Sequence, residues 1–153
     1  YEPPLGHGVM KLPSGAAFAV LESPGDSWPA NNAPTDQHFL GYTLDDQQQP
    51  TFRYRVNGVT VEDFPQPVAT ALDTGFKRTF TFRATPPLAN FFFRAAAGKI
   101  VERPDGSFLI EDKLTLKFPG AKASVRRNGD KAELLVPVIF SGNQAQLVEE
   151  FSW

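Results

Sequence analysis

The stretch "PTFRYRVNGVTVEDF", residues 50–64, is the feature that most constrains the fold of this chain. Asn57-Gly58 suits a two-residue type I′ turn, because both central residues of that turn take positive φ. Such a turn places Val56 opposite Val59 and fixes the register of two antiparallel strands. The two faces then carry different side chains, apolar on one side and polar on the other: Phe52, Tyr54, Val56, Val59 and Val61 against Arg53, Arg55, Thr60 and Glu62. The hairpin therefore predicts an antiparallel sheet that packs on one face only.

Short alternating segments separated by turn residues continue along the rest of the chain. "FKRTFTFRA" sends Phe76, Phe80 and Phe82 to one face, and "NFFFRAA" is apolar on both faces, which predicts a central strand. We find no convincing helix, and the 14 Pro and 12 Gly fall mostly between the apolar runs. We therefore predict an all-β, antiparallel β-sandwich, jelly-roll or supersandwich-like, with about a dozen short strands. We expect one domain over residues 1–153, excised from a longer protein because the chain begins abruptly at "YEPPLGHG".

Composition excludes several classes of function. The chain has no Cys, so it contains no disulfide, thiolate metal site or covalent haem attachment. Its 15 basic and 17 acidic residues form no basic patch suited to nucleic acid, and we expect no nucleic-acid partner. The apolar runs are too short to span a bilayer, and no signal peptide is expected.

Residues that commonly carry chemistry do not form a recognisable set. His7 and His38 lack the neighbours of a metal site, and we expect structural or surface roles for both. Four pairs of adjacent acids occur where we expect turns or strand ends and solvated side chains: Asp45-Asp46, Glu62-Asp63, Glu111-Asp112 and Glu149-Glu150. Neighbours on a strand point to opposite faces, so no such pair supplies the facing carboxylates of a glycoside hydrolase. We predict no catalytic residue, no metal site and no cofactor within this chain.

A long loop rich in Pro, Asn and Asp, residues 22–37, is the best candidate for ligand binding. Long loops in compact domains are disproportionately functional. An exposed Trp ring stacks on sugars, and nearby amides and carboxylates hold their hydroxyls. The candidate set combines both kinds of side chain: Trp28, Asn31, Asn32, Asp36, His38 and Tyr42. The alternative is that Trp28 tucks down and anchors the loop, since Trp is usually mostly buried.

The segment "HFLGYTLDDQQQPTFRYRVNGVTVEDF", together with "FKRTFTFRA", "NFFFRAAAGKI" and the final "EEFSW", carries a family resemblance. Over residues 38–153 the chain resembles the accessory β-sandwich of large extracytoplasmic bacterial proteins that also carry cytochrome c and sorbosone-dehydrogenase-like propeller domains. The strand order is similar to the supersandwich of sugar-mutarotase-like proteins, from which no catalytic residue is carried over. The resemblance implies a periplasmic or secreted location and other domains of a parent protein as partners.

Three functions follow from these observations. The first is a non-catalytic accessory module that binds carbohydrate through the loop of residues 22–38. The second is a structural or interaction module that packs on a redox or catalytic partner domain. The third is a small sugar-active enzyme with scattered acid and base residues. An exposed Trp28 favours the first, an exposed apolar patch the second, and a pocket with convergent titratable groups the third.

Overall fold

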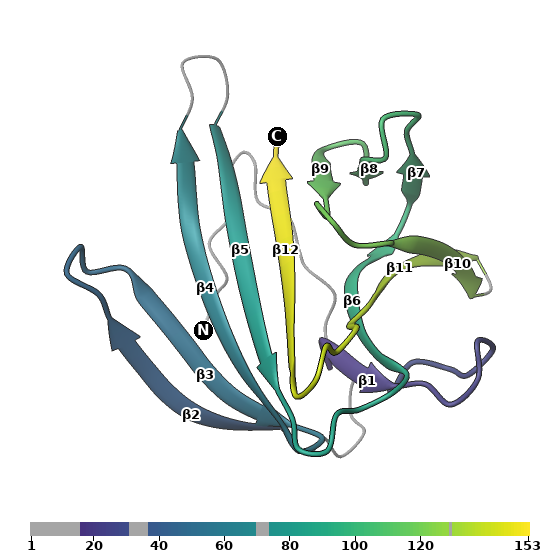
Figure 1. Cartoon of the computed structure of the whole chain (residues 1–153). Coiled ribbons are helices and arrows are strands. Elements are labelled where there is room, and N and C mark those ends of the chain that lie inside the picture. Colours follow the sequence, from purple (N-terminus) through teal and green to yellow (C-terminus); the bar gives the residue numbers. More distant parts are fainter. Residues whose placement is uncertain (1–15, 31–36, 70–73, 129) are drawn as a thin grey trace.

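The structure, a computed structural model, describes residues 16–30, 37–69, 74–128 and 130–153. These residues form twelve strands and no helix, and all the strand pairs are antiparallel. The smaller sheet has the order β1-β6-β11-β10, and the larger has the order β2-β3-β4-β5-β12-β9-β8-β7. The two sheets pack face to face in a β-sandwich (Figure 1), which confirms the predicted fold class.

The strands range from three residues in β1, β7 and β8 to eleven in β4, so several are longer than the predicted short strands. Their bounds are β1 Phe18–Val20, β2 Gln37–Leu44, β3 Pro50–Val56, β4 Val59–Ala69, β5 Thr74–Arg83, β6 Phe91–Gly98, β7 Ile100–Glu102, β8 Phe108–Ile110, β9 Leu114–Lys117, β10 Ser124–Asn128, β11 Lys131–Pro137 and β12 Gln144–Ser152.

The hairpin of β3 and β4 turns at Asn57-Gly58 with φ of 50° and 78°. Val56 lies opposite Val59, so the predicted register is confirmed. Arg53 lies opposite Glu62 in this register, but the two side chains do not form an ion pair. Glu62 instead pairs with Arg83, which projects from the neighbouring strand β5 on the same face.

Phenylalanine rings join the two sheets in one core. Phe18 of β1 lies 5.2 Å from Phe93 of β6, and Phe93 lies 5.1 Å from Phe80 of β5, measured between ring centroids. Phe80 and Phe82 are fully buried, as their alternation predicts. β6 has a neighbour on each side, so the apolar run "NFFFRAA" is a central strand as expected. These rings pack in the core together with aliphatic side chains such as Val61, Leu134 and Leu147.

The smaller sheet covers only part of the larger one. Figure 1 shows β2 and β3 spreading away from the four strands of the smaller sheet. Val56 and Val61, near the hairpin turn, are buried against the smaller sheet, whereas no residue of β2 is buried. Among the described residues, no strand of the smaller sheet covers this end of the larger sheet on the face that elsewhere forms the core.

Candidate functional site

Trp28 is buried beneath its loop. Its side chain is 7% exposed, and the indole N–H donates a hydrogen bond of 2.8 Å to the carbonyl oxygen of Ala16. The ring packs with Leu21 and Leu135 on the outer face of the smaller sheet, and the Arg94 guanidinium carbon lies 5.3 Å from its centroid. This is the anchor arrangement, and it offers no free ring face for a sugar.

The other candidate ligand residues are not gathered around Trp28. Asn31, Asn32 and Asp36 lie outside the described residues. His38 and Tyr42 are exposed on β2, in the larger sheet, while Trp28 packs on the smaller one. Trp28 and Tyr42 therefore do not form one aromatic platform.

Tyr42 instead belongs to an apolar surface that sequence reasoning did not single out. Phe39 is 66% exposed, Tyr42 61% and Leu44 50%, and all three lie on β2. Each faces an apolar residue of β3 across the strand pair: Phe39 opposite Tyr54, Tyr42 opposite Phe52 and Leu44 opposite Pro50. We call these six side chains the β2–β3 apolar face.

A β-bulge at Leu40 creates this surface. The register shifts between Phe39 and Gly41, so Leu40 is the extra residue on β2. Side chains of a regular strand alternate, and residues three apart then point to opposite faces. The extra residue restores Phe39 and Tyr42 to the same side. The sequence signal was the Gly41 within a strand-like run, because Gly inside a strand often marks a bulge. Gly41 has φ of 117°.

A buried charge cluster lies between the sheets. The Arg78 Nε–H lies 3.1 Å from both oxygens of Asp63, and its Nη2 donates to Oδ2 at 2.8 Å. Arg78 Nη1 is 3.7 Å from Glu149 Oε1, an oxygen with no hydrogen-bond partner in the described part of the chain. Asp63 is 7% exposed and Glu149 1%. The expectation that their acid pairs are solvated near strand ends is therefore wrong for both residues.

Burial has the largest effect on the protonation of Glu149. It raises the pKa of Glu149 to about 8, against the opposing charge of Arg78. It also raises the pKa of Tyr54, whose phenol is further disfavoured as an anion by the carboxylate of Asp63. A carboxyl group that stays protonated at neutral pH is a feature of many active sites and also of some structural networks.

The space beside the cluster is too small for a sugar-sized substrate. A cavity of about 140 Å³ is lined by Arg78, Glu149 and Phe151 of the larger sheet and by Ala16, Phe93 and Ala95 on the other side. Pockets for small-molecule ligands usually measure roughly 300–1,000 Å³. This cavity is smaller than that range, and its walls come from both sheets of the sandwich.

The cluster makes stability depend on pH. The folded protein holds a proton on Glu149 between the ordinary pKa of 4.5 and about 8, and unfolding releases that proton. The free energy of unfolding should therefore fall as pH rises through this window and level off above it. Chemical denaturation at several pH values across this range should show the decrease in the free energy of unfolding of the wild type. The decrease should be smaller in Glu149→Gln, because the glutamine side chain mimics the protonated carboxyl group. Identical pH profiles for the two proteins would contradict this protonation state.

A second hollow lies beside the described part of the loop of residues 22–37. It measures about 250 Å³ and is lined by Leu21, Phe92 and Leu135 together with Glu22, Asn90 and Arg126. Apolar walls with a few polar groups are typical of ligand sites. The hollow lies on the outer face of the smaller sheet, close to Trp28 but without its ring among the lining residues.

The described residues show neither a metal-binding cluster nor a membrane-spanning helix. Among the described ranges, no three His, Cys, Asp or Glu side chains gather closely enough to hold a metal ion. The described segments also include no helix with the length and hydropathy needed to cross a membrane.

Comparison with known proteins adds no relative. No family model, no curated protein and no solved structure matches the chain.

Proposed function

We propose that this chain is a non-catalytic binding module that docks onto a partner protein through the β2–β3 apolar face. The observation that carries the proposal is the exposure of Phe39, Tyr42 and Leu44 side by side on one strand. Isolated exposed apolar residues are ordinary, but a contiguous group of large ones marks an interaction surface. Aromatic residues are also enriched at the centre of protein interfaces.

The geometry supports binding rather than catalysis. The titratable cluster of Asp63, Arg78 and Glu149 is enclosed beside a cavity of about 140 Å³. The β2–β3 apolar face, in contrast, is open and carries no carboxylate or amine among its six residues. An open apolar surface without convergent acid–base groups supports association and not bond chemistry.

The proposal also includes the cellular location of the module and the kind of domain that it binds. The resemblance to accessory sandwiches of extracytoplasmic cytochrome c and sorbosone-dehydrogenase-like proteins favours a periplasmic or secreted location and a redox or catalytic domain as the partner. That part of the proposal rests on the sequence motifs of residues 38–153.

Carbohydrate binding is the second candidate, favoured by the hollow of about 250 Å³ beside Glu22 and Phe92. Its lining mixes apolar walls with carboxylate, amide and guanidinium groups, the combination that a sugar needs. The hollow is smaller than most small-molecule pockets, which is why we rank it below the open face.

The test introduces a photoreactive side chain in place of Tyr42 in the source cells. We expect irradiation to join position 42 to one defined protein, identified by mass spectrometry. The matched control places the same group at Ile139, which is 76% exposed and lies outside the β2–β3 apolar face. With the identified partner, Tyr42→Ser combined with Leu44→Ser should weaken binding by about tenfold or more, because two large apolar contacts are lost.

Two results would count against docking by this face. Equal crosslinking from positions 42 and 139 would mean that the contacts are unspecific. Binding of the wild type to a glycan array, weakened by Glu22→Ala and unchanged by Tyr42→Ser with Leu44→Ser, would favour the carbohydrate candidate instead.

A further inference from the structure

The backbone edge of β2 has no neighbour in the described part of the chain. β2 is first in the order of the larger sheet and pairs only with β3. It has eight residues, whereas β7 at the opposite end of that sheet has three. Exposed edges are usually protected by Pro, Lys, β-bulges or short length, because their free N–H and C=O groups accept another strand. The β2 sequence "QHFLGYTL" contains neither Pro nor Lys, and beyond its bulge at Leu40 the residues Gly41–Leu44 form a regular strand.

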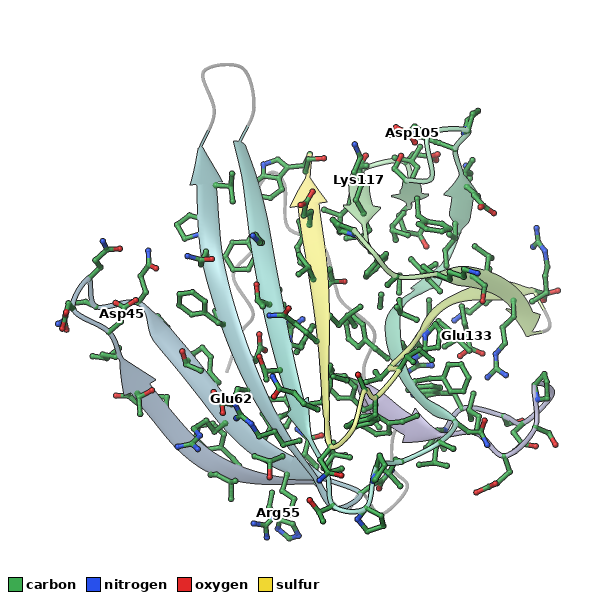
Figure 2. The ribbon with its side chains drawn as sticks, viewed as in Figure 1. Asp45, Arg55, Glu62, Asp105, Lys117 and Glu133 are labelled. Atoms are coloured by element: carbon green, nitrogen blue, oxygen red, sulfur yellow. The ribbon has the colours of Figure 1, made fainter. Side chains whose placement is uncertain are left out.

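The two faces of the β2–β3 hairpin differ in charge. One is the β2–β3 apolar face, and the other carries Arg53 and Arg55 of β3, both exposed. Arg55 projects outward beyond the ribbon at the lower end of β3 (Figure 2). Neither arginine forms an ion pair with a described residue, since the nearby Glu62 is engaged by Arg83. This second face is therefore positively charged.

Gly41 opens a path from Arg53 to the edge, whereas His38 lies between Arg55 and the edge. Gly41 lies directly opposite Arg53 in the strand pair. A Cβ atom built at Gly41 meets nothing within 4 Å. The position directly opposite Arg53 therefore carries no side chain. A strand that adds beyond β2 would lie two spacings, roughly 10 Å, from β3, a distance that an Arg and a Glu side chain span together.

We propose that the partner binds by contributing an extended segment that adds to the free edge of β2, with apolar and acidic side chains in alternation. This inference rests on the proposed docking function and names the chemistry of its partner. The apolar side chains of the added strand extend the β2–β3 apolar face, and its carboxylates lie on the face that carries Arg53 and Arg55, nearest to Arg53 across Gly41. Main-chain hydrogen bonds supply the affinity in strand addition, and the alternate side chains supply the specificity.

Two other occupants fit less well. A second copy paired through β2 would bring Arg53 and Arg55 of both copies onto the same face, where like charges repel. Residues 1–15, "YEPPLGHGVMKLPSG", contain one acid, Glu2, followed by two prolines that lack an N–H group. Neither offers the alternating acidic pattern that the basic face favours.

Short synthetic peptides test the proposal on the intact chain. The probes are an alternating Val-Glu peptide, the Val-Lys counterpart, and the Val-Glu peptide N-methylated at every second amide. By fluorescence anisotropy we expect the Val-Glu peptide to bind about tenfold or more tightly than either of the others. Its affinity should fall with added salt, because the contacts to the arginines are exposed. Chemical shift changes should concentrate in β2.

Charge reversal provides the decisive comparison. Arg53→Glu with Arg55→Glu should invert the preference toward the Val-Lys peptide. The control, Lys122→Glu with Arg127→Glu, makes the same change in net charge at exposed positions elsewhere and should leave the preference unaltered. Circular dichroism confirms that both variants fold.

The outcomes separate this inference from the proposed function. One outcome is that Tyr42→Ser with Leu44→Ser weakens binding of the crosslinked partner while the charge reversal of Arg53 and Arg55 leaves it unchanged. That result would support docking through the β2–β3 apolar face and would contradict the addition of an acidic strand. Equal binding of the Val-Glu and Val-Lys peptides also overturns it. A dimer in analytical ultracentrifugation that Tyr42→Ser disperses would assign the edge to a second copy. If position 42 crosslinks no protein and no peptide binds, both proposals fail.

Discussion

Replacing Arg78 with methionine is expected to lower the free energy of unfolding by about 3–5 kcal/mol. Methionine keeps much of the apolar stem but removes the charge that Asp63 and Glu149 both contact. A buried pair adds little net stability while intact, because desolvation offsets the attraction between the charges. Removal of one partner is costly, because Asp63 at 7% exposure is left as an uncompensated carboxylate.

The measurement is chemical denaturation at neutral pH, with Arg83→Met as the matched control. Arg83 lies on the same strand and also pairs with a glutamate, Glu62, but its side chain is 55% exposed. Exposed ion pairs contribute about 0–1 kcal/mol, so the control should be nearly as stable as the wild type. Equal losses for the two variants would mean that burial does not govern the Asp63–Arg78–Glu149 cluster.

Trp28→Ala is expected to destabilise the fold by a similar amount, about 3–5 kcal/mol. The indole fills the space between Leu21 and Leu135 and donates to the carbonyl oxygen of Ala16. Truncation leaves a cavity and an unsatisfied carbonyl group, and it removes the ring beneath the Arg94 guanidinium.

A charge network under the same loop adds to this expectation. Arg94 and Arg126 each lie 3.6 Å from a carboxylate oxygen of Glu133, the residue labelled on β11 in Figure 2. Arg126 also donates to the carbonyl oxygens of Pro24 and Asp26, at 3.1 and 2.7 Å. Loss of the Trp28 ring should therefore loosen the loop and expose charged groups that are now shielded.

Trp153→Ala is the control for Trp28→Ala. Trp153 is 69% exposed, so the same chemical change there should alter the free energy of unfolding by no more than about 0.5 kcal/mol. Thermal melts of both variants provide the comparison. An unchanged melting temperature in Trp28→Ala, accompanied by loss of glycan binding, would restore the platform role for this residue.

Local sequence patterns predicted the strands because the rules involved are local. The hairpin at Asn57-Gly58 depends on two residues that tolerate positive φ and on alternation in the flanking strands. The fully buried Phe80 and Phe82 follow from the period of two in β5. Neither feature requires knowledge of what lies across the sheet.

The sequence indicated the buried charge cluster less clearly than it indicated the strands. Arg78 points to the same face of β5 as Phe80, and Glu149 points to the same face of β12 as Leu147. Each charged residue therefore interrupts a series of apolar side chains. A single charge in such a series is usually read as solvated. The pairing of β4, β5 and β12 brings Asp63, Arg78 and Glu149 together, and that pairing joins segments far apart in the chain.

The sequence by itself therefore determined the all-β class, the hairpin register and the apolar side of most strands, because each depends on neighbours along the chain. Only the tertiary structure decided that Trp28 is buried, because its contacts come from β1 and β11. It also decided that Phe39, Tyr42 and Leu44 are exposed. Their apolar pattern is the pattern of a core strand. They remain uncovered because four strands of the smaller sheet face eight in the larger, and β2 lies at the end that they do not reach.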